Sequence, residues 1–321
     1  MIDPAPLKFL PYLKSVIWGG NKICEYKGIE QPEPNIGESW EISAVPGHES
    51  IVAEGDYKGL KLTELIQMFG EDLLGKRVLE KYGYAFPLLI KIIDANDNLS
   101  VQVHPDDALA GKRHESLGKT EMWYIIKADE GAKIYAGLNT ALTPDEYVTR
   151  VTDGTFAETL AVHDSAPGDV FFLPAGRVHA IGAGNLLAEI QESSDITYRI
   201  YDYDRRDANG NPRELHTEQA KDAIDYNVYP DYKSPRPSDK EEIARIGECE
   251  HFITDRVLVD GENTLALSEG SFNVLICIEG EVTLIYDNRK MILSKGTSVL
   301  LPAVMHQVGV SGKATLLRTS L

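Results

Sequence analysis

Short apolar segments, separated by turn residues, occur through most of this chain. Several alternate apolar and polar positions, which is typical of strands with one buried face. We expect strands at Phe86–Ile93, Leu99–Val103, Met122–Ile126, Asp169–Leu173, Leu186–Gln191, Ile196–Tyr203, Asn273–Glu279, Val282–Tyr286 and Ser298–Leu301. This many short strands predicts a mainly β protein built from a barrel or a sandwich.

Helical spacing of apolar residues is confined to three segments. We expect helices over about 63–82, 143–162 and 217–226, the first interrupted near Gly70 and Gly75 and the second near Gly154. The second begins with a strong signal, because Thr143 can cap it, Pro144 suits its first turn and Glu146 completes a capping box.

A similar order of glycine, proline and histidine residues occurs twice. Gly168 to His179 holds an apolar run, a Pro-x-Gly turn and then a histidine, and Gly296 to His306 repeats the theme with Val304 in place of the second glycine. The repeat predicts two related barrels. The proline-rich stretch 227–240 indicates a linker, or a long loop clamped to the surface. We therefore expect a catalytic domain over 1–230, containing the helices, and a second domain over 231–321.

Composition narrows the choice of partners. The 321 residues include 50 acidic against 32 basic side chains, a formal charge of −18, which argues against nucleic acid and anionic membranes as partners. An anionic substrate would need a local basic cluster. Three widely spaced cysteines fit buried free thiols, and we see neither a leader nor an apolar segment of about 20 residues. We expect a cytoplasmic protein, monomeric by default, with a weak homodimer as the alternative.

Inward-facing polar side chains on these strands suggest a metal site. Alternation places Ser100, Gln102 and His104 on one face, and Lys119, Glu121 and Trp123 on another. His179 is the first polar residue that can turn inward after the Pro-x-Gly turn. Two imidazoles and a carboxylate suit a divalent cation, to which Gln102 could add an amide oxygen. The residue types leave zinc, iron, manganese and cobalt open.

The second half lacks an equivalent ligand set. No histidine pair or suitably placed glutamate occurs around 272–281, and His306 stands alone. We expect the second domain to be metal-free and His306 to be structural.

The Gly-x5-Pro-x-Gly-x2-His run resembles the second signature of the cupin superfamily. Four further motifs make the chain similar to type I mannose-6-phosphate isomerases of the short bacterial branch: Ser100–Asp107, Gly118–Tyr124, Pro174–His179 and Glu189–Arg199. The resemblance extends from Ile17 to the C-terminal barrel. It implies two cupin jelly-roll barrels and an enzyme that interconverts mannose 6-phosphate and fructose 6-phosphate through a cis-enediol(ate).

The resemblance also implies roles for individual residues. Gln102, His104, Glu121 and His179 would bind one zinc ion. Arg199 would match the active-site arginine, Glu189 a carboxylate lining the pocket, and Ser100 and Lys119 residues near the phosphate and the reacting carbons. One departure is Gly118, where longer members have a histidine, so no role of that histidine transfers.

Several roles stay open at this level. We expect Lys119 and Arg199 to bind the sugar phosphate, while the proton carrier could be Glu189 with a raised pKa, Lys119 or water. Trp18 and Trp40 either line the sugar pocket or pack in the hydrophobic core. The alternatives are an iron cupin oxygenase, a sugar-phosphate-binding cupin without enzymatic activity, and an isomerase of another aldose phosphate.

Overall fold

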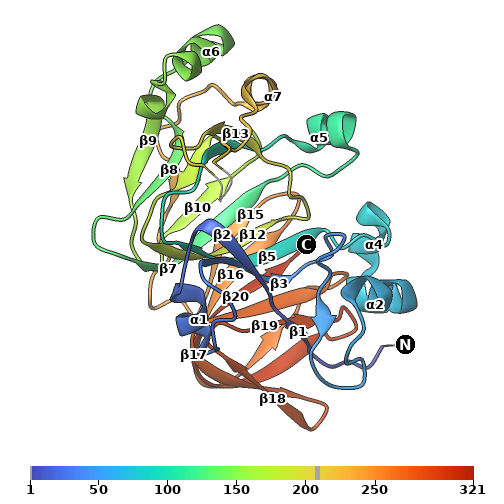
Figure 1. Cartoon of the computed structure of the whole chain (residues 1–321). Helices are drawn as coiled ribbons and strands as arrows, with labels where there is room; N and C mark the ends of the chain where they lie inside the picture. Colours follow the sequence, from blue (N-terminus) through green and yellow to red (C-terminus); the bar gives the residue numbers. More distant parts are fainter. Residues whose placement is uncertain (1, 207–209) are drawn as a thin grey trace.

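A computed structural model describes residues 2–206 and 210–321, whose strands form three sheets (Figure 1). Two of them are formed by strands that lie between residues 12 and 234. The seven-stranded sheet has the order β14 (Lys233–Ser234), β10 (Val170–Leu173), β7 (Glu121–Ala128), β12 (Asn185–Glu192), β5 (Leu88–Ala95), β3 (Ile36–Ile42), β2 (Tyr12–Gly20). The five-stranded sheet has the order β13 (Tyr198–Tyr201), β6 (Val101–Val103), β11 (His179–Ile181), β8 (Lys133–Leu138), β9 (Leu160–Asp164).

The third sheet has eight strands and lies against the outer face of the seven-stranded one. Its order is β15 (Ile243–Glu248), β16 (Ile253–Ala266), β20 (Gln307–Ser320), β17 (Asn273–Tyr286), β19 (Ser298–Leu301), β1 (Leu7–Leu10), β4 (Ile51–Val52), with β18 (Arg289–Ser294) paired to β17. Two strands near the N-terminus, β1 and β4, thus complete a sheet whose other strands come from the C-terminal part of the chain. In this sheet Leu7 of β1 is the register partner of Leu300 of β19.

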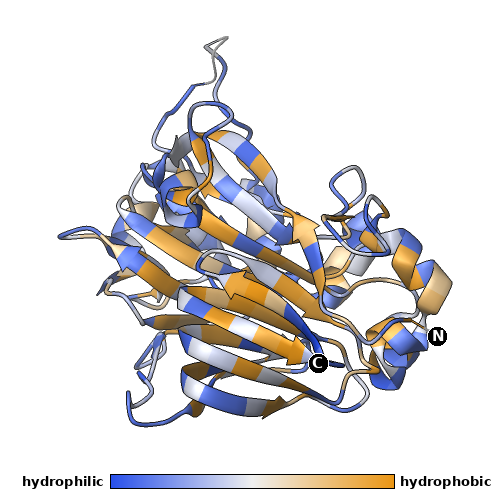
Figure 2. Cartoon of the chain, turned by 90° about the horizontal axis from the view of Figure 1, so that it is seen from below, coloured by the Kyte–Doolittle hydropathy of each residue, from blue (hydrophilic) through white to orange (hydrophobic). Residues whose placement is uncertain are grey.

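Because successive side chains point to opposite faces, the seven-stranded sheet contributes to two different hydrophobic cores, one on each face. Met122 and Tyr124 of β7 pack in the cluster shared with the eight-stranded sheet, whereas Trp123 and Ile125 pack in the cluster facing the five-stranded sheet. In Figure 2, apolar residues lie along the strands of the packed sheets. The even-numbered residues of β7 therefore join the two halves, and the odd-numbered ones point into the catalytic half.

The mainly β jelly-roll class is confirmed, although the strands form sheets packed face to face rather than closed barrels. Several boundaries were wrong. Residues 273–279 and 282–286 belong to the single strand β17, and β13 is shorter than the expected 196–203. The stretch 227–240 contains β14, which pairs with β10, so it is held to the surface of the catalytic half.

Helices cover the outside of the sheets. The segment 63–82 is divided into α2 (Leu62–Phe69), α3 (Glu71–Leu74) and α4 (Lys76–Tyr82), with the breaks at Gly70 and Gly75 that the sequence predicts. The remaining helices are α1 (Lys22–Lys27), α5 (Asp107–His114), α6 (Pro144–Thr152), the 3-10 helix η1 (Phe156–Thr159) and α7 (Thr217–Ala223). None of the helices in the described ranges is long and apolar enough to cross a membrane.

The helix expected over 143–162 begins as predicted but ends early. Thr143 and Glu146 form the reciprocal capping box, and α6 stops at Thr152. Leu160 to Asp164 instead forms β9, in which Val162 pairs with Tyr135 of β8. Pairing with an existing sheet edge outweighs the weak helical spacing of this segment. The third helix ends at Ala223 rather than Tyr226.

The two copies of the glycine-proline-histidine theme differ at the histidine. His179 follows Pro174 by five residues and is buried in β11, whereas His306 follows Pro302 by four and is exposed just before β20. A one-residue difference reverses the face on which a side chain lies in extended chain. His306 is also absent from the clusters of potential metal ligands found in the described residues.

Candidate functional site

Residues from both sheets of the catalytic half converge on one buried cluster. Glu121 begins β7 in the seven-stranded sheet, and His179 begins β11 in the five-stranded sheet, where it is the register partner of Gln102. His104 follows the end of β6. Ligand atoms of His104, Glu121 and His179 lie within 4.8 Å of one another, and all three residues are at most 1% exposed. The structure thus brings together the residues whose alternation suggested a metal site.

Backbone carbonyls fix the proton on each imidazole. Nδ1 of His104 lies 2.9 Å from the carbonyl oxygen of Ile196, and Nδ1 of His179 lies 2.8 Å from that of Arg177. A carbonyl oxygen only accepts, so each Nδ1 carries the proton and each Nε2 presents a lone pair to the cluster. Burial lowers the pKa of His179 to about 3, which keeps the ring neutral. Both rings are therefore prepared to ligate a cation.

Glu121 supplies a carboxylate whose oxygens are buried without hydrogen bonds. Oε1 lies 3.2 Å from Nε2 of His179, and Oε2 lies 3.6 Å from Nε2 of His104 and 2.9 Å from Nζ of Lys119. Burial raises the pKa of Glu121 to about 7 despite the opposing charge of Lys119. Orphaned carboxylate oxygens facing two imidazole lone pairs fit a divalent cation.

Gln102 lies at the edge of this cluster. Its amide nitrogen is 3.3 Å from Nε2 of His179, so in this orientation the amide donates to the imidazole. Turning the amide over would direct its oxygen to the same place, where it could join the ligand set. Gln102 is therefore placed as the sequence predicted.

A second row of polar residues crosses the seven-stranded sheet beside the cluster. Trp123, Glu189 and Lys91 are register partners on β7, β12 and β5. Nε1 of Trp123 donates to Oε1 of Glu189 over 2.9 Å, and Nζ of Lys91 lies 3.0 Å from Oε2. Burial alone would raise the pKa of Glu189, but Lys91, Lys119 and Trp123 together lower it to about 2. A raised pKa was the condition under which Glu189 could carry protons, and this condition is not met, because the carboxylate is held ionised.

A cavity of about 420 Å³ opens onto these residues. Trp18, Ser100, Gln102, Lys119, Glu189 and Arg199, all predicted site residues, line it. Among the described residues on its wall, five cations (Lys14, Lys91, Lys119, Arg199 and Arg213) outnumber three carboxylates (Glu38, Glu189 and Asp195). An otherwise acidic protein thus has a local basic cavity beside a potential metal site, and such a cavity favours an anionic ligand.

Arg199 has an unsatisfied donor in this cavity. It is the register partner of Gln102 on β6, and its Nη1 donates to the carbonyl oxygen of Glu214 over 2.9 Å. Its Nε is buried without a hydrogen-bond acceptor. Burial and the neighbouring Arg213 lower the pKa of the guanidinium. An anion would relieve both the missing bond and the repulsion. Tyr201, two residues further along β13, does not line the cavity, because the register shifts between Arg199 and Tyr201.

The two tryptophans differ in position. Trp18 is on the cavity wall, whereas Trp40 does not line it. Trp40 instead donates from Nε1 to Oε2 of Glu38 over 2.6 Å, and Nζ of Lys91 lies 5.3 Å from its ring centre. Trp40 therefore contacts two residues of the wall, Glu38 and Lys91, without lining the cavity itself.

Sequence reasoning missed several wall residues. Lys91 could have been recognised from the sequence as a buried functional residue, because it is a single cation within the apolar run Leu88–Ile93. Lys14, Glu38 and Arg213 come from β2, β3 and a loop, and nothing in their local sequence separates them from ordinary surface charges.

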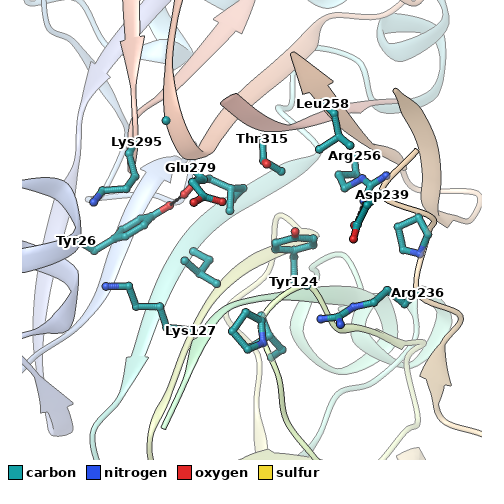
Figure 3. Close-up of a pocket in the computed structure, with 17 residues that line it drawn as sticks. Tyr26, Tyr124, Lys127, Arg236, Asp239, Arg256, Leu258, Glu279, Lys295 and Thr315 are labelled. Atoms are coloured by element: carbon teal, nitrogen blue, oxygen red, sulfur yellow. Dashed lines mark hydrogen bonds and ion pairs between the residues drawn. The ribbon is translucent and has the colours of Figure 1, made fainter. Parts of the chain in front are cut away.

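Another cavity, of about 630 Å³, lies between β7 and the eight-stranded sheet. Figure 3 shows Tyr124 and Thr315 facing one another across it, with Lys295 beside Tyr26 and Arg236 on the opposite side. None of its described wall residues is a histidine or cysteine. It therefore lacks the ligand set that distinguishes the first cavity.

Facing jelly-roll sheets that hold two histidines and a glutamate beside a basic cavity define a protein of the cupin class. Residues 7–135 match the family model of the phosphomannose isomerase type I catalytic domain, and residues 242–321 match that of the mannose-6-phosphate isomerase cupin domain. The chain is 38% identical to mannose-6-phosphate isomerase ManA of Bacillus subtilis over 96% of each chain. It is 44% identical to mannose-6-phosphate isomerase of Streptococcus mutans over 68% of this chain and 67% of that one. The crystal structure of the Bacillus subtilis mannose 6-phosphate isomerase superposes with a TM-score of 0.89 at 37% identity, covering 99% of this chain and all of that one. The chain belongs to the type I phosphomannose isomerase family.

Proposed function

We propose that this protein is a zinc-dependent isomerase that interconverts mannose 6-phosphate and fructose 6-phosphate through a cis-enediol(ate). The observation that carries the proposal is the pair of orphaned Glu121 oxygens facing the lone pairs of His104 and His179, beside a basic cavity. Membership of the phosphomannose isomerase family supports the substrate.

We assign His104, Glu121, His179 and Gln102 as ligands of one zinc ion. Three nitrogen and oxygen donors with a weaker fourth suit a catalytic ion that keeps room for substrate. When bound, the ion would supply Lewis-acid stabilisation of negative charge on the sugar oxygens, worth several kcal/mol. The hydrogen bonds from Nδ1 of His104 and His179 to backbone carbonyls would keep the two rings oriented.

Arg199 and Arg213 are proposed to hold the anionic part of the substrate. The buried Nε of Arg199 lacks an acceptor, and Arg213 is fixed by Asp202, whose Oδ2 lies 2.6 Å from Nε of Arg213. A sugar phosphate bound here would place its carbon chain along the cavity toward Lys119 and Gln102, which line the same space. Ser100 and Trp18 would bound the sugar.

Lys119 is proposed to exchange protons with the sugar oxygens. Its Nζ lies 2.9 Å from Oε2 of Glu121 and 3.2 Å from Nε2 of His104, so it faces the same point as the ligands. Glu189 is less suited to proton transfer, because Trp123 and Lys91 occupy its two oxygens and its pKa is lowered to about 2. We assign Glu189 the role of holding the Lys91 ammonium in place and of supplying a negative charge beside it.

The state of the cysteines bears on the cellular compartment of the protein. Cys24 and Cys277 are buried free thiols and Cys249 is half-buried, which fits a reducing cytoplasm. We propose a monomer, because every site residue above comes from one chain.

A coupled assay on the purified protein tests this function. Turnover of mannose 6-phosphate should be lost after chelation and return with Zn²⁺, and metal content measured on the same samples should follow activity. Binding of the sugar phosphate without interconversion would identify a binding protein instead, and oxygen consumption would identify an oxygenase. Turnover that survives complete removal of metal would refute the zinc dependence.

A further inference from the structure

A second cluster of potential ligands lies outside the site described above. Asp107 begins α5, Glu192 ends β12, and His251 lies in the loop between β15 and β16 of the eight-stranded sheet. One ligand atom from each residue lies within 4.8 Å of the other two. The cluster thus joins the catalytic half to the C-terminal sheet.

Both carboxylates of this cluster hold the segment that carries Lys119. Oδ1 of Asp107 accepts the backbone N–H of Gly118, and Oε2 of Glu192 accepts that of Thr120, each over 2.7 Å. Each carboxylate therefore has one oxygen engaged with the backbone. The second oxygen of Glu192 faces Nδ1 of His251.

Two polar atoms of the cluster are buried and unsatisfied, one on Glu192 and one on His251, whereas Asp107 is exposed. Oε1 of Glu192 and Nδ1 of His251 lie 3.0 Å apart, yet neither makes a hydrogen bond. Glu192 is 2% exposed and His251 is 8% exposed. Two atoms bonded to one cation at about 2.1 Å lie roughly 3.0–3.4 Å apart, so this separation suits a shared ion.

The surroundings favour a cation as the missing partner. In the described parts of the chain, no lysine or arginine forms an ion pair with Asp107 or Glu192. The other ring nitrogen of His251, Nε2, faces Oε1 of Glu250 at 3.6 Å. A carboxylate on the far nitrogen of the ring is a common feature of histidines that bind metal. Burial also raises the pKa of Glu192 to about 7, with Asp107 adding to the effect.

We propose that Asp107, Glu192 and His251 form a second site for a divalent transition-metal ion such as Zn²⁺. Two carboxylate oxygens and one imidazole nitrogen make a mixed ligand set that Zn²⁺, Co²⁺ and Mn²⁺ accept. A bound ion links the β15–β16 loop to the segment 118–120. Its role is structural, since it fixes the chain on either side of Lys119 without entering the cavity.

Metal stoichiometry tests the second site without relying on activity. The protein is stripped with chelator, dialysed against Zn²⁺ and analysed for metal, and Co²⁺ titrations follow the ligands by visible absorption. Glu192→Gln and His251→Gln remove one ligand each, and Gln at position 192 can still accept the N–H of Thr120. Glu121→Gln probes the first site, and His306→Gln is the control because His306 is an exposed histidine outside both clusters.

We expect two equivalents of metal in the unmodified protein and in His306→Gln, and one in each of the other variants. Affinity for the second equivalent should fall at least about 10–100-fold in Glu192→Gln and His251→Gln. A single equivalent that Glu121→Gln abolishes would overturn the proposal, even if neither variant of the second cluster folds. A single equivalent that survives Glu121→Gln but not Glu192→Gln would support the second site and count against the first.

Discussion

Nε2 of His179 and Oε1 of Glu121 face each other at 3.2 Å in the buried cluster. The proton of the imidazole is on Nδ1, where the carbonyl of Arg177 accepts it. Two lone pairs in contact inside a protein are unfavourable unless a cation lies close to both. This contact supports the proposal of a cation at the cluster, and five predictions test the site and its surroundings.

Glu121→Gln should abolish metal binding and reduce turnover by at least about a thousandfold, since a Lewis acid contributes several kcal/mol. Zn²⁺ should raise the unfolding temperature of the unmodified protein but not that of the variant, because a ligand that binds only the folded state stabilises it. Thermal unfolding with and without chelator measures this. His104→Ala should likewise lose metal and activity together, and full turnover in either metal-free variant would count against the site.

Arg199→Ala should retain its metal but lose turnover. Removing a group that positions the sugar phosphate should cost about 10²-fold in kcat/KM, because the reacting carbons are then no longer held in place. Steady-state kinetics and metal analysis on the same preparation separate the two effects. Arg236→Ala is the control, because Arg236 lines the other cavity. Unchanged rates in Arg199→Ala would remove this residue from the site.

Lys91→Met should destabilise the protein by about 3–5 kcal/mol at neutral pH, because it leaves the buried Glu189 carboxylate without its closest cation. Lys14→Met is the control. Lys14 lies 3.6 Å from Glu38 with a side chain 40% exposed, and such pairs contribute about 0–1 kcal/mol. Urea unfolding compares the two variants, and equal small losses would contradict the importance of the Lys91–Glu189 pair.

The same variant has a definite pH dependence. The pKa of Glu189 in the folded protein is about 2, below the ordinary value of about 4.3. Its ionisation therefore stabilises the fold above about pH 4.3, and this contribution is lost as pH falls toward 2. Without Lys91, burial should raise this pKa, so Lys91→Met becomes relatively more stable in acid. The stability gap between the two proteins should narrow from pH 7 to pH 4, and a constant gap would argue against this cause.

Gly137→Ala should destabilise the fold more than Gly131→Ala. Both glycines have left-handed backbone, with φ of 80° and 78°. A Cβ at position 137 would lie 2.0 Å from the ring of Tyr232, whereas nothing lies within 4 Å at position 131. The shared backbone penalty is about 1–2 kcal/mol, and the clash should add about 1–3 kcal/mol. Equal losses in urea unfolding would mean that Tyr232 does not pack tightly on Gly137.

The sequence was sufficient to predict which side chains face the space between the two sheets, because period-two alternation is local. Gln102, Glu121 and His179 all lie where their strand faces direct them. Lys91 could not be assigned a role, because its partner Glu189 is defined by the order of β5 and β12 in the sheet, which no local pattern contains. For the same reason the sequence left open whether the pKa of Glu189 is raised. Burial of this carboxylate was expected, but the opposing charge of Lys91 was not.

Because β1 pairs with β19, the first strand of the chain is synthesised long before its partner strand. Leu7 leaves the ribosome well before its register partner Leu300, by roughly 15–60 s at 5–20 residues per second. During that interval Leu7 and Phe9, both buried in the finished protein, lack the strand that will cover them. The nascent catalytic half therefore displays an open apolar edge until synthesis is nearly complete, and it is at this stage that chaperones would have most to protect.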